Sequence, residues 1–223
     1  MHIFFSLVFT FLVSYIFYIF AVSSLGKYFI RNGNPNYVYN QHLSISISVF
    51  VLGCLFSAWS YGDYGSVIAT IFASIGILIS ISDVNIYKIP NYLLVWAFIL
   101  LICCVVLFSI AYGNVIFIIN SMIVFLVTIF LSVIAFWIKI PIGIGDLKLY
   151  TIFLSWLGSF NVEFALYAYI LSTVILLLCF CVSRISGIMK QKLAFAPCIC
   201  VSSLLVWLIF ISNTFTLTNI VLQ

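Results

Sequence analysis

Long apolar runs, broken only by short polar turns, are the feature that most constrains how this chain can fold. Of its 223 residues, 66% are hydrophobic and 5% are charged, with a mean hydropathy of +1.39. A soluble domain of this length could not bury so much apolar surface. In a bilayer every backbone donor and acceptor must be bonded, and long runs without alternation favour helices over barrel strands. The sequence therefore predicts an all-α, polytopic transmembrane helical bundle.

Polar and turn residues divide the chain into about eight predicted spans, most of them near the ~20 residues that a bilayer requires. The spans cover approximately residues 3–24, 45–60, 66–82, 92–112, 115–137, 147–158, 164–183 and 198–218. The span after Asp146 is the weakest, because few apolar residues precede Gly158, and we expect it to be tilted, sunken or partly re-entrant. No linker or fixed-period repeat interrupts the chain, which predicts a single domain over residues 1–223.

The basic residues indicate the orientation of the predicted spans. With eight spans, all 8 Lys and Arg residues fall in alternate loops. Basic residues accumulate on the cytoplasmic side, so these loops are expected there and both termini on the non-cytoplasmic side. Asp83 and Asp146 then share the cytoplasmic face. The basic residues are scattered and form no patch, which argues against a nucleic-acid partner.

Asp83 and Asp146 are two of only 4 acidic residues, and each lies at the end of an apolar span. A carboxylate beside hydrocarbon is costly, so it indicates function and calls for a partner. Two neighbouring carboxyl groups cannot both ionise: one keeps a proton and polarises a scissile carbonyl, while the other takes a proton from water. Helix macrodipoles favour an anion at Asp146, which opens a helix, over Asp83, which closes one. We therefore expect Asp146 to be the base and Asp83 the acid; helix capping is the alternative role of Asp146.

Glycine and proline residues surround both aspartates. Gly143 and Gly145 allow close backbone approach, and an extended substrate could pair with this strand-like segment through main-chain hydrogen bonds. Pro90 and Pro141 break the helices, and unwound backbone at membrane depth is tolerated where it lines a cavity. Each aspartate is thus predicted to lie beside an irregular, proline-containing segment.

Three polar side chains near the aspartates have two interpretations each. Asn91 either assists catalysis by hydrogen bonding or caps a helix that begins at Tyr92. Lys88 and Lys148 either tune the pKa of the aspartates and meet an acidic substrate group, or anchor the chain at lipid headgroups.

The cysteines do not predict a metal site. Side chains at i and i+2 on a helix point away from each other, so the two close cysteine pairs make poor chelates. We expect buried thiols that behave as small apolar residues, and no role for His2 and His42. The cysteines are Cys54, Cys103, Cys104, Cys179, Cys181, Cys198 and Cys200, all in predicted spans.

Three motifs together resemble the bacterial type IV prepilin peptidases, membrane aspartyl proteases of the Gly-x-Gly-Asp class. They are Gly-x-Gly-Asp at 143–146, Asp83 six residues ahead of Ile89-Pro90-Asn91, and Lys192-Leu193-Ala194-Phe195-Ala196-Pro197, which is similar to that family's loop before its final helix. They cover the chain from residue 83 to about 200. The resemblance implies that Asp83 and Asp146 are catalytic. The expected active-site loops and substrate contacts are Gly143, Gly145, Pro90, Asn91 and Lys148.

The resemblance implies a membrane aspartic endopeptidase of the bacterial inner membrane. It would cut the short basic leader from prepilins or pilin-like secretion pseudopilins at the cytoplasmic face, usually after a glycine. Many family members also methylate the new amino terminus with S-adenosylmethionine, whereas proteolysis requires no cofactor. The cytoplasmic domain of long members, with its two Cys-x-x-Cys pairs, is absent here, so the chain resembles a short form without a zinc site.

Other classes remain open on the sequence alone. A transporter or channel subunit could use paired aspartates and broken helices to bind a cation or relay protons, but such sites lie near the midplane, whereas Asp83 and Asp146 are at loop edges. An assembly subunit without chemistry would leave the paired aspartates unexplained. Presenilin-like and signal-peptide-peptidase-like proteases share the glycine motif, although the Ile-Pro-Asn block and the chain length favour the prepilin branch.

Overall fold

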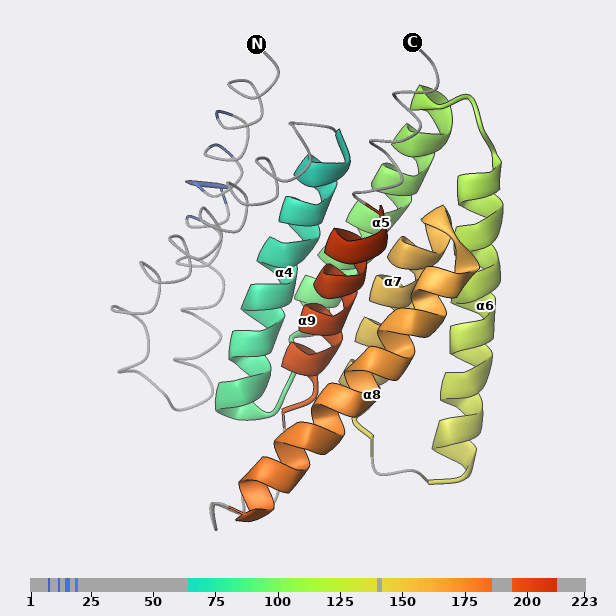
Figure 1. Cartoon of the computed structure of the whole chain (residues 1–223). Coiled ribbons are helices and arrows are strands. Elements are labelled where there is room, and N and C mark those ends of the chain that lie inside the picture. The colour runs from blue at the N-terminus through green and yellow to red at the C-terminus, as the bar shows by residue number, and fades with distance from the viewer. Residues whose placement is uncertain are drawn as a thin grey trace. The chain divides into compact units, whose positions relative to one another are not determined.

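The computed structural model of the chain describes residues 64–139, 142–185 and 194–211, with the isolated positions 8, 12, 15, 16 and 19. Every regular element in these ranges is helical, which confirms the predicted class for this part of the chain. The helices are α4 (Tyr64–Ile86), α5 (Asn91–Ala111), α6 (Ile116–Trp137), α7 (Ile144–Phe160), α8 (Val162–Ile185) and α9 (Ala196–Val206), and a π-helical turn, Trp207–Ile211, follows α9 (Figure 1).

The chain forms two compact units that divide within α4. The first is Met1–Leu78 with Ser212–Gln223, of which the described part is the beginning of α4 and the isolated positions. The second is Ile79–Ile211. It contains the last turns of α4, the helices α5 to α9 and both aspartates, so the candidate site lies within one unit.

In the described part of the chain four helices are long and apolar enough to cross a membrane, which supports a membrane protein. They are Ile68–Asn85, Asn91–Ile110, Ile116–Trp137 and Val162–Ile185, and a shorter apolar helix covers Ala196–Ile209. Within the predicted span 3–24 the structure describes residues 8, 12, 15, 16 and 19, and the predicted span 45–60 lies outside the described residues. The count of eight spans and the location of the termini therefore stay predictions.

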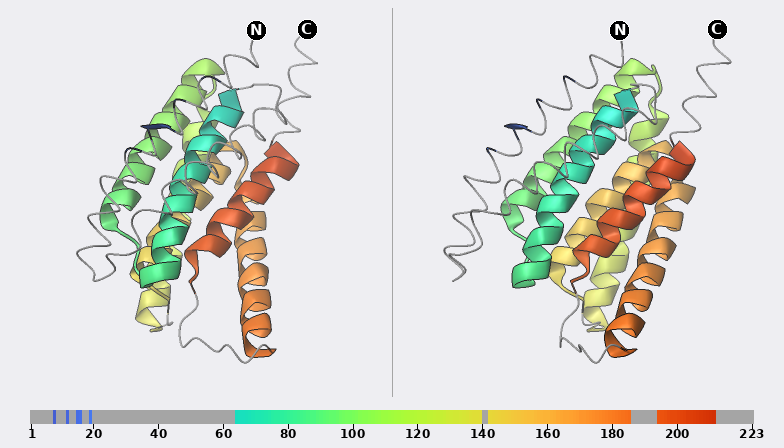
Figure 2. Two further views of the ribbon diagram at one scale, coloured as in Figure 1. Left: turned by 90° about the vertical axis from the view of Figure 1, so that its left-hand side faces the viewer. Right: turned by 60° about the vertical axis from the view of Figure 1, so that its left-hand side comes forward.

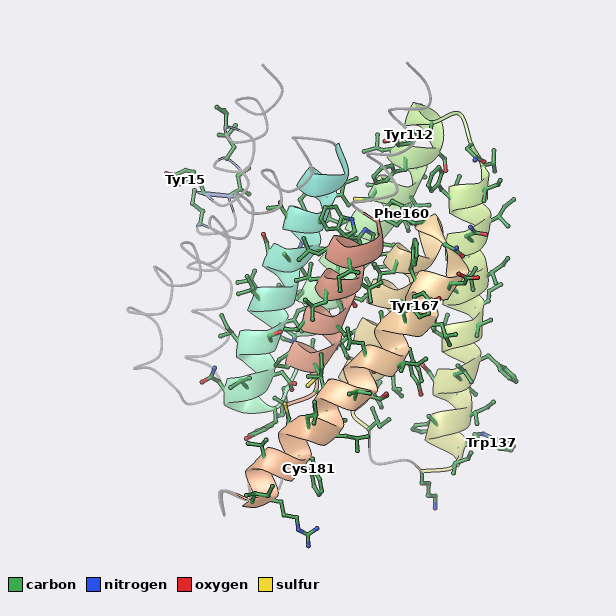
Figure 3. The ribbon with its side chains drawn as sticks, in the orientation of Figure 1. Tyr15, Tyr112, Trp137, Phe160, Tyr167 and Cys181 are labelled. Carbon is green, nitrogen blue, oxygen red and sulfur yellow. The ribbon has the colours of Figure 1, made fainter. Side chains whose placement is uncertain are left out.

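Successive helices of the second unit run in alternating directions (Figures 1 and 2). Helices α5, α7 and α9 run one way, and α6 and α8 run the other. Tyr112, which follows α5, lies at one end of the unit, and Trp137 and Cys181, near the ends of α6 and α8, lie at the other (Figure 3). The last turn of α4 and the first turns of α7 and α9 lie at the end marked by Trp137.

Helix α7 is the central helix of the second unit and packs against α5, α6, α8 and α9. It has 17 residues, and every residue from Leu149 to Ser159 is buried. Because α7 meets protein rather than lipid, it tolerates hydroxyl side chains, which bond to carbonyls one turn back. This explains the low hydropathy of the predicted span after Asp146, which is a continuous helix rather than a re-entrant segment.

Helices α6 and α8 each bury one narrow stripe of small or polar residues and expose their other faces. The stripes are Ser121, Val124 and Thr128 on α6, and Ala165, Ala168 and Ser172 on α8. Apolar attraction does not drive helices together in lipid, so close backbone approach at small residues supplies the packing. The exposed faces carry large apolar side chains such as Leu126 and Phe130, as a lipid-facing surface requires.

Gly158 on α7 packs directly against Val124 on α6. A Cβ at Gly158 would lie 2.5 Å from Val124 Cγ2 and 2.9 Å from Val124 Cβ. We expect Gly158→Ala to lower the free energy of unfolding by about 2–3 kcal/mol through overpacking. The measurement is the melting temperature in detergent. Adding Val124→Ala, which removes the nearest methyl group, should recover part of the loss; an unchanged melting temperature in the single variant would contradict this packing.

Candidate active site

Asp83 lies in the last turn of α4, and its side chain is only 5% exposed. Its Oδ2 accepts a hydrogen bond from the N–H of Ala196 at 3.0 Å, and the N–H of Phe195 is a second donor. Phe195 is the N-cap residue of α9 and Ala196 is its first helical residue, so neither N–H has a partner inside the helix. The amino terminus of α9 therefore holds the Asp83 carboxyl group.

This contact corrects the argument from helix ends. Asp83 does close its own helix, where an anion is disfavoured, but its carboxyl group faces the positive end of α9. Burial works against ionisation of Asp83, and the two N–H groups favour it. The argument from helix ends left out α9, so it does not decide which aspartate carries the negative charge, and that assignment stays a prediction.

Asp146 is the third residue of α7, and Gly143 is the N-cap residue. The Asp146 carboxyl group accepts a hydrogen bond from the Gly143 N–H, as an acidic residue at this position does in a capping box. The alternative role of Asp146 as the N-cap is therefore wrong. Its Oδ1 is buried and has no hydrogen-bond partner in the described part of the chain.

Burial and the neighbouring charge of Asp83 raise the pKa of Asp146 to about 6, although the Gly143 hydrogen bond lowers it. The segments that carry the two aspartates also touch, since a Cβ at Gly145 would lie 3.3 Å from Ile89 Cβ. Carboxyl groups that interact in this way titrate as a pair. The fold thus brings together two aspartates that are far apart in the sequence; their catalytic role stays a prediction.

The turn that follows Asp83 is fixed by three local features. Tyr87 has a left-handed backbone (φ 54°), and its N–H donates to the Asp83 carbonyl at 2.8 Å, which ends α4. The hydroxyl of buried Ser82 donates to the Lys88 carbonyl at 2.8 Å. Pro90 is the N-cap residue of α5 in an extended conformation. As predicted, Pro90 lies at a break between two helices.

The polar residues near the pair differ in part from expectation. Asn91 is the first residue of α5 and is exposed, so the prediction that it caps a helix beginning at Tyr92 is wrong by one position. Lys88 and Lys148 are exposed, and neither contributes to the shifted pKa of Asp146. Their exposure at the end of the unit suits the anchoring interpretation better than a role in tuning the pair.

The strand-like segment predicted over Gly143 and Gly145 is shorter than expected. Gly143 is extended (φ −64°, ψ 139°), but α7 begins at Ile144 and places Gly145 in its first turn. The predicted main-chain pairing with a substrate could therefore use only the residues before Ile144. Pro141 lies outside the described residues.

Three of the described cysteines contradict the expected burial. Cys104, Cys198 and Cys200 are buried, whereas Cys103, Cys179 and Cys181 are exposed, and all six are free thiols. Within the described ranges no group of three or more His, Cys, Asp or Glu side chains could hold a metal ion. Cys54, His2 and His42 lie outside the described residues.

Sequence reasoning missed the backbone donors of Phe195 and Ala196. A signal was present, because Pro197 at the second helical position is typical of a helix start, where N–H groups lack helical partners. It also missed Tyr150, which lies one helical turn after Asp146 on α7. The hydroxyl of Tyr150 is hydrogen-bonded to Ser172 on α8. No local pattern marks that pair, since a tyrosine in an apolar run reads as a packing residue.

The arrangement has the parts for acid–base chemistry on a single water molecule. One carboxyl group, Asp83, is bonded to backbone N–H groups. The other, Asp146, has an oxygen without a partner among the described residues and a pKa near the physiological range. Comparisons of the chain with protein-family models, with curated proteins and with solved structures give no match.

Proposed function

We propose that this chain is a membrane aspartic endopeptidase that removes the short basic leader from type IV prepilins or pilin-like pseudopilins at the cytoplasmic face of the bacterial inner membrane. The observation that carries the proposal is the electrostatic coupling of Asp83 and Asp146 at one end of a helical unit. The prepilin substrate rests on the resemblance of the Gly-x-Gly-Asp and Ile-Pro-Asn motifs.

In the proposed mechanism Asp83 is ionised and Asp146 carries the proton, which reverses the assignment expected from helix ends. Two backbone N–H groups face Asp83, and such donors favour the charged form of a carboxyl group. Asp146 has a buried oxygen that has no partner within the described ranges, and its pKa is raised to about 6. A proton on Asp146 gives that carboxyl group a donor for the carbonyl oxygen of a substrate.

The reaction then follows the general course of two-carboxylate hydrolysis. The oxygen of a water molecule attacks the scissile carbonyl carbon while Asp83 takes one proton of that water and Asp146 gives its proton to the carbonyl oxygen. The resulting gem-diol collapses, the C–N bond breaks, and the proton on Asp83 passes to the leaving nitrogen. One of the two hydroxyl protons of the gem-diol returns to Asp146, and the other stays on the product carboxyl group. The pair is thus restored, and the products are a carboxyl group and an amine.

The depth of the pair favours a protease over a transporter. Asp83 lies three residues before the end of α4, and Asp146 is the third residue of α7. Cation and proton sites of transporters lie near the bilayer midplane, within discontinuous helices. A pair at helix ends suits a cleavage site where a substrate emerges from the bilayer.

A cleavage assay tests the proposed function. The purified full chain, inserted in lipid vesicles, is incubated with a synthetic peptide that has a basic leader, a glycine and an apolar helix. Mass spectrometry should detect the free leader and the new amino terminus, and the Asp83→Asn/Asp146→Asn double variant should yield neither. Absence of cleavage by fully inserted wild type would refute the proposal. A proton leak into dye-loaded vesicles that depends on both aspartates would support the transporter class instead.

Gly143→Ala should slow leader removal by about 10-fold or more, because misplacement of a reacting group by about 1 Å costs up to 10². Its Cβ would lie 2.8 Å from Asp146 Oδ2 and would push the carboxyl group aside. Gly145→Ala is the matched control: among the described residues its Cβ would meet only the side chain of Ile89, at 3.3 Å or more, so its effect should be smaller. Both variants are compared by their initial cleavage rates. If Gly145→Ala lost as much rate as Gly143→Ala, or more, this geometry would be contradicted.

A further inference from the structure

Tyr150 lies one helical turn after Asp146 on α7, and its side chain is 7% exposed. The two side chains are close enough to interact electrostatically. Residues four positions apart on a helix are neighbours on the same face. A buried tyrosine at this position therefore forms part of the surroundings of the Asp146 carboxyl group.

The phenol of Tyr150 is committed to a hydrogen bond with α8. Its oxygen is bonded to the hydroxyl of Ser172, which is fully buried. The Ser172 hydroxyl donates its single proton to the Tyr169 carbonyl at 2.8 Å, so Tyr150 must be the donor in the Tyr150–Ser172 bond. The phenol proton is thus directed away from Asp146, which excludes Tyr150 as its proton donor in this arrangement.

The ring of Tyr150 packs against α9 at the point that holds Asp83. The centroids of the Tyr150 and Phe195 rings are 5.3 Å apart, and the Tyr169 ring lies 5.7 Å from Tyr150 on another side. Phe195 is the N-cap residue of α9, and its N–H and that of Ala196 donate to Asp83. One side chain therefore links the helix that carries Asp146 to the helix start that bonds Asp83.

We propose that Tyr150 is a positioning residue that sets the two aspartates relative to each other, by fixing the start of α9 against α7 and α8. The expected change in cleavage rate rests on the proposed protease function. The expected change in the position of the two aspartates does not. If the ring is lost, the N–H groups of Phe195 and Ala196 are free to move away from Asp83. If only the phenol oxygen is lost, the packing against Phe195 remains.

Among the residues that the structure describes, few other titratable groups surround the pair. Tyr150 interacts electrostatically with Asp146, and Cys198 and Cys200 of α9 interact with Asp83. Asp146 and Asp83 also interact with each other. The exposed Lys88 and Lys148 do not contribute to the shifted pKa of Asp146. A change in the titration of Asp146 in a Tyr150 variant can therefore be attributed to the position and hydration of the pair.

The test compares Tyr150→Leu, which removes the ring, with Tyr150→Phe, which keeps it. Tyr167→Leu, at an exposed aromatic position of α8, is the matched control and should leave the cleavage rate unchanged (Figure 3). We expect Tyr150→Leu to lower kcat by about 10- to 100-fold and Tyr150→Phe by about 3-fold or less. The acid limb of the pH–rate profile should move to higher pH in Tyr150→Leu, because the ionised Asp83 loses its donors.

A second readout does not depend on cleavage. Infrared titration of the Asp146 carboxyl band should give a midpoint closer to the ordinary value in Tyr150→Leu, because water fills the space of the ring. Profiles and midpoints that match wild type in folded Tyr150→Leu would overturn the inference. If wild type cleaves no leader but the midpoint moves in Tyr150→Leu and not in Tyr167→Leu, the protease function fails and the positioning role stands. If Tyr150→Leu does not fold, Tyr150→Phe provides the test. A 100-fold loss of cleavage rate in Tyr150→Phe, with the Asp146 titration midpoint unchanged, would overturn the positioning role of Tyr150.

Discussion

Asp83→Asn should abolish leader removal at every pH, by a factor of at least about 10³, because the variant has no group that can take a proton from water. Asparagine has the shape of aspartate, and its side-chain oxygen can still accept the hydrogen bond from Ala196. The variant should therefore insert and fold normally. Asp83→Ala is less informative, because it would leave the buried N–H of Ala196 without its acceptor, at a cost of about 1–3 kcal/mol.

The control for Asp83→Asn is Glu163→Gln, which removes an exposed carboxyl group in the first turn of α8. Helix α8 begins at the end of the unit opposite to the aspartates, so Glu163→Gln should retain the wild-type rate. Cleavage is measured at equal levels of inserted protein over a pH series. If Asp83→Asn kept more than about a tenth of the wild-type rate at any pH, Asp83 could not be the general base.

The helices next to the aspartates could be predicted from the sequence because lipid imposes a strong pattern. The predicted spans 92–112 and 115–137 agree closely with α5 (Asn91–Ala111) and α6 (Ile116–Trp137). Pro90 ends one helical run and begins another, as its missing N–H and fixed φ require. Long apolar runs bounded by turns leave little choice of structure at membrane depth.

The environment of each carboxyl group could not be predicted, because it depends on contacts between distant segments. The donors to Asp83 come from α9, and no pattern around residue 83 indicates them. A shift of three residues in the start of α7 changes Asp146 from an N-cap to a third-position residue and turns its side chain back towards Gly143. The proposed acid and base roles rest on these contacts, and the ends of α4 and α7 alone do not indicate them.

Asp146→Asn should have a second, independent effect on stability. The pKa of Asp146 is raised from 3.8 to about 6 by burial and by the charge of Asp83. A group with a raised folded-state pKa contributes stability that is complete below its unfolded-state value and is lost as pH rises through the folded-state value. The Asn variant does not ionise, so we expect it to melt at a higher temperature than wild type at pH 8. The two should melt together near pH 4.

The same substitution should remove the alkaline limb of the cleavage profile. In wild type the rate constant kcat/KM should fall as pH rises through about 6, because Asp146 loses the proton that polarises the carbonyl. Asparagine donates a hydrogen bond at every pH but transfers no proton. Asp146→Asn should therefore be slower by about 10²–10⁴-fold and should keep only the acid limb, which reports protonation of Asp83.

The profile of Asp146→Asn decides between the two assignments of the pair. If Asp146 were the base instead, its replacement would leave no residual rate to profile, and Asp83→Asn would be the variant that keeps a slow, single-limbed rate. Because coupled carboxyl groups titrate as a pair, both single variants must be measured over the same pH range. If the pH–rate profile of Asp146→Asn kept both limbs, as in the wild type, the alkaline limb would belong to another group. Asp146 would then have no part in proton transfer.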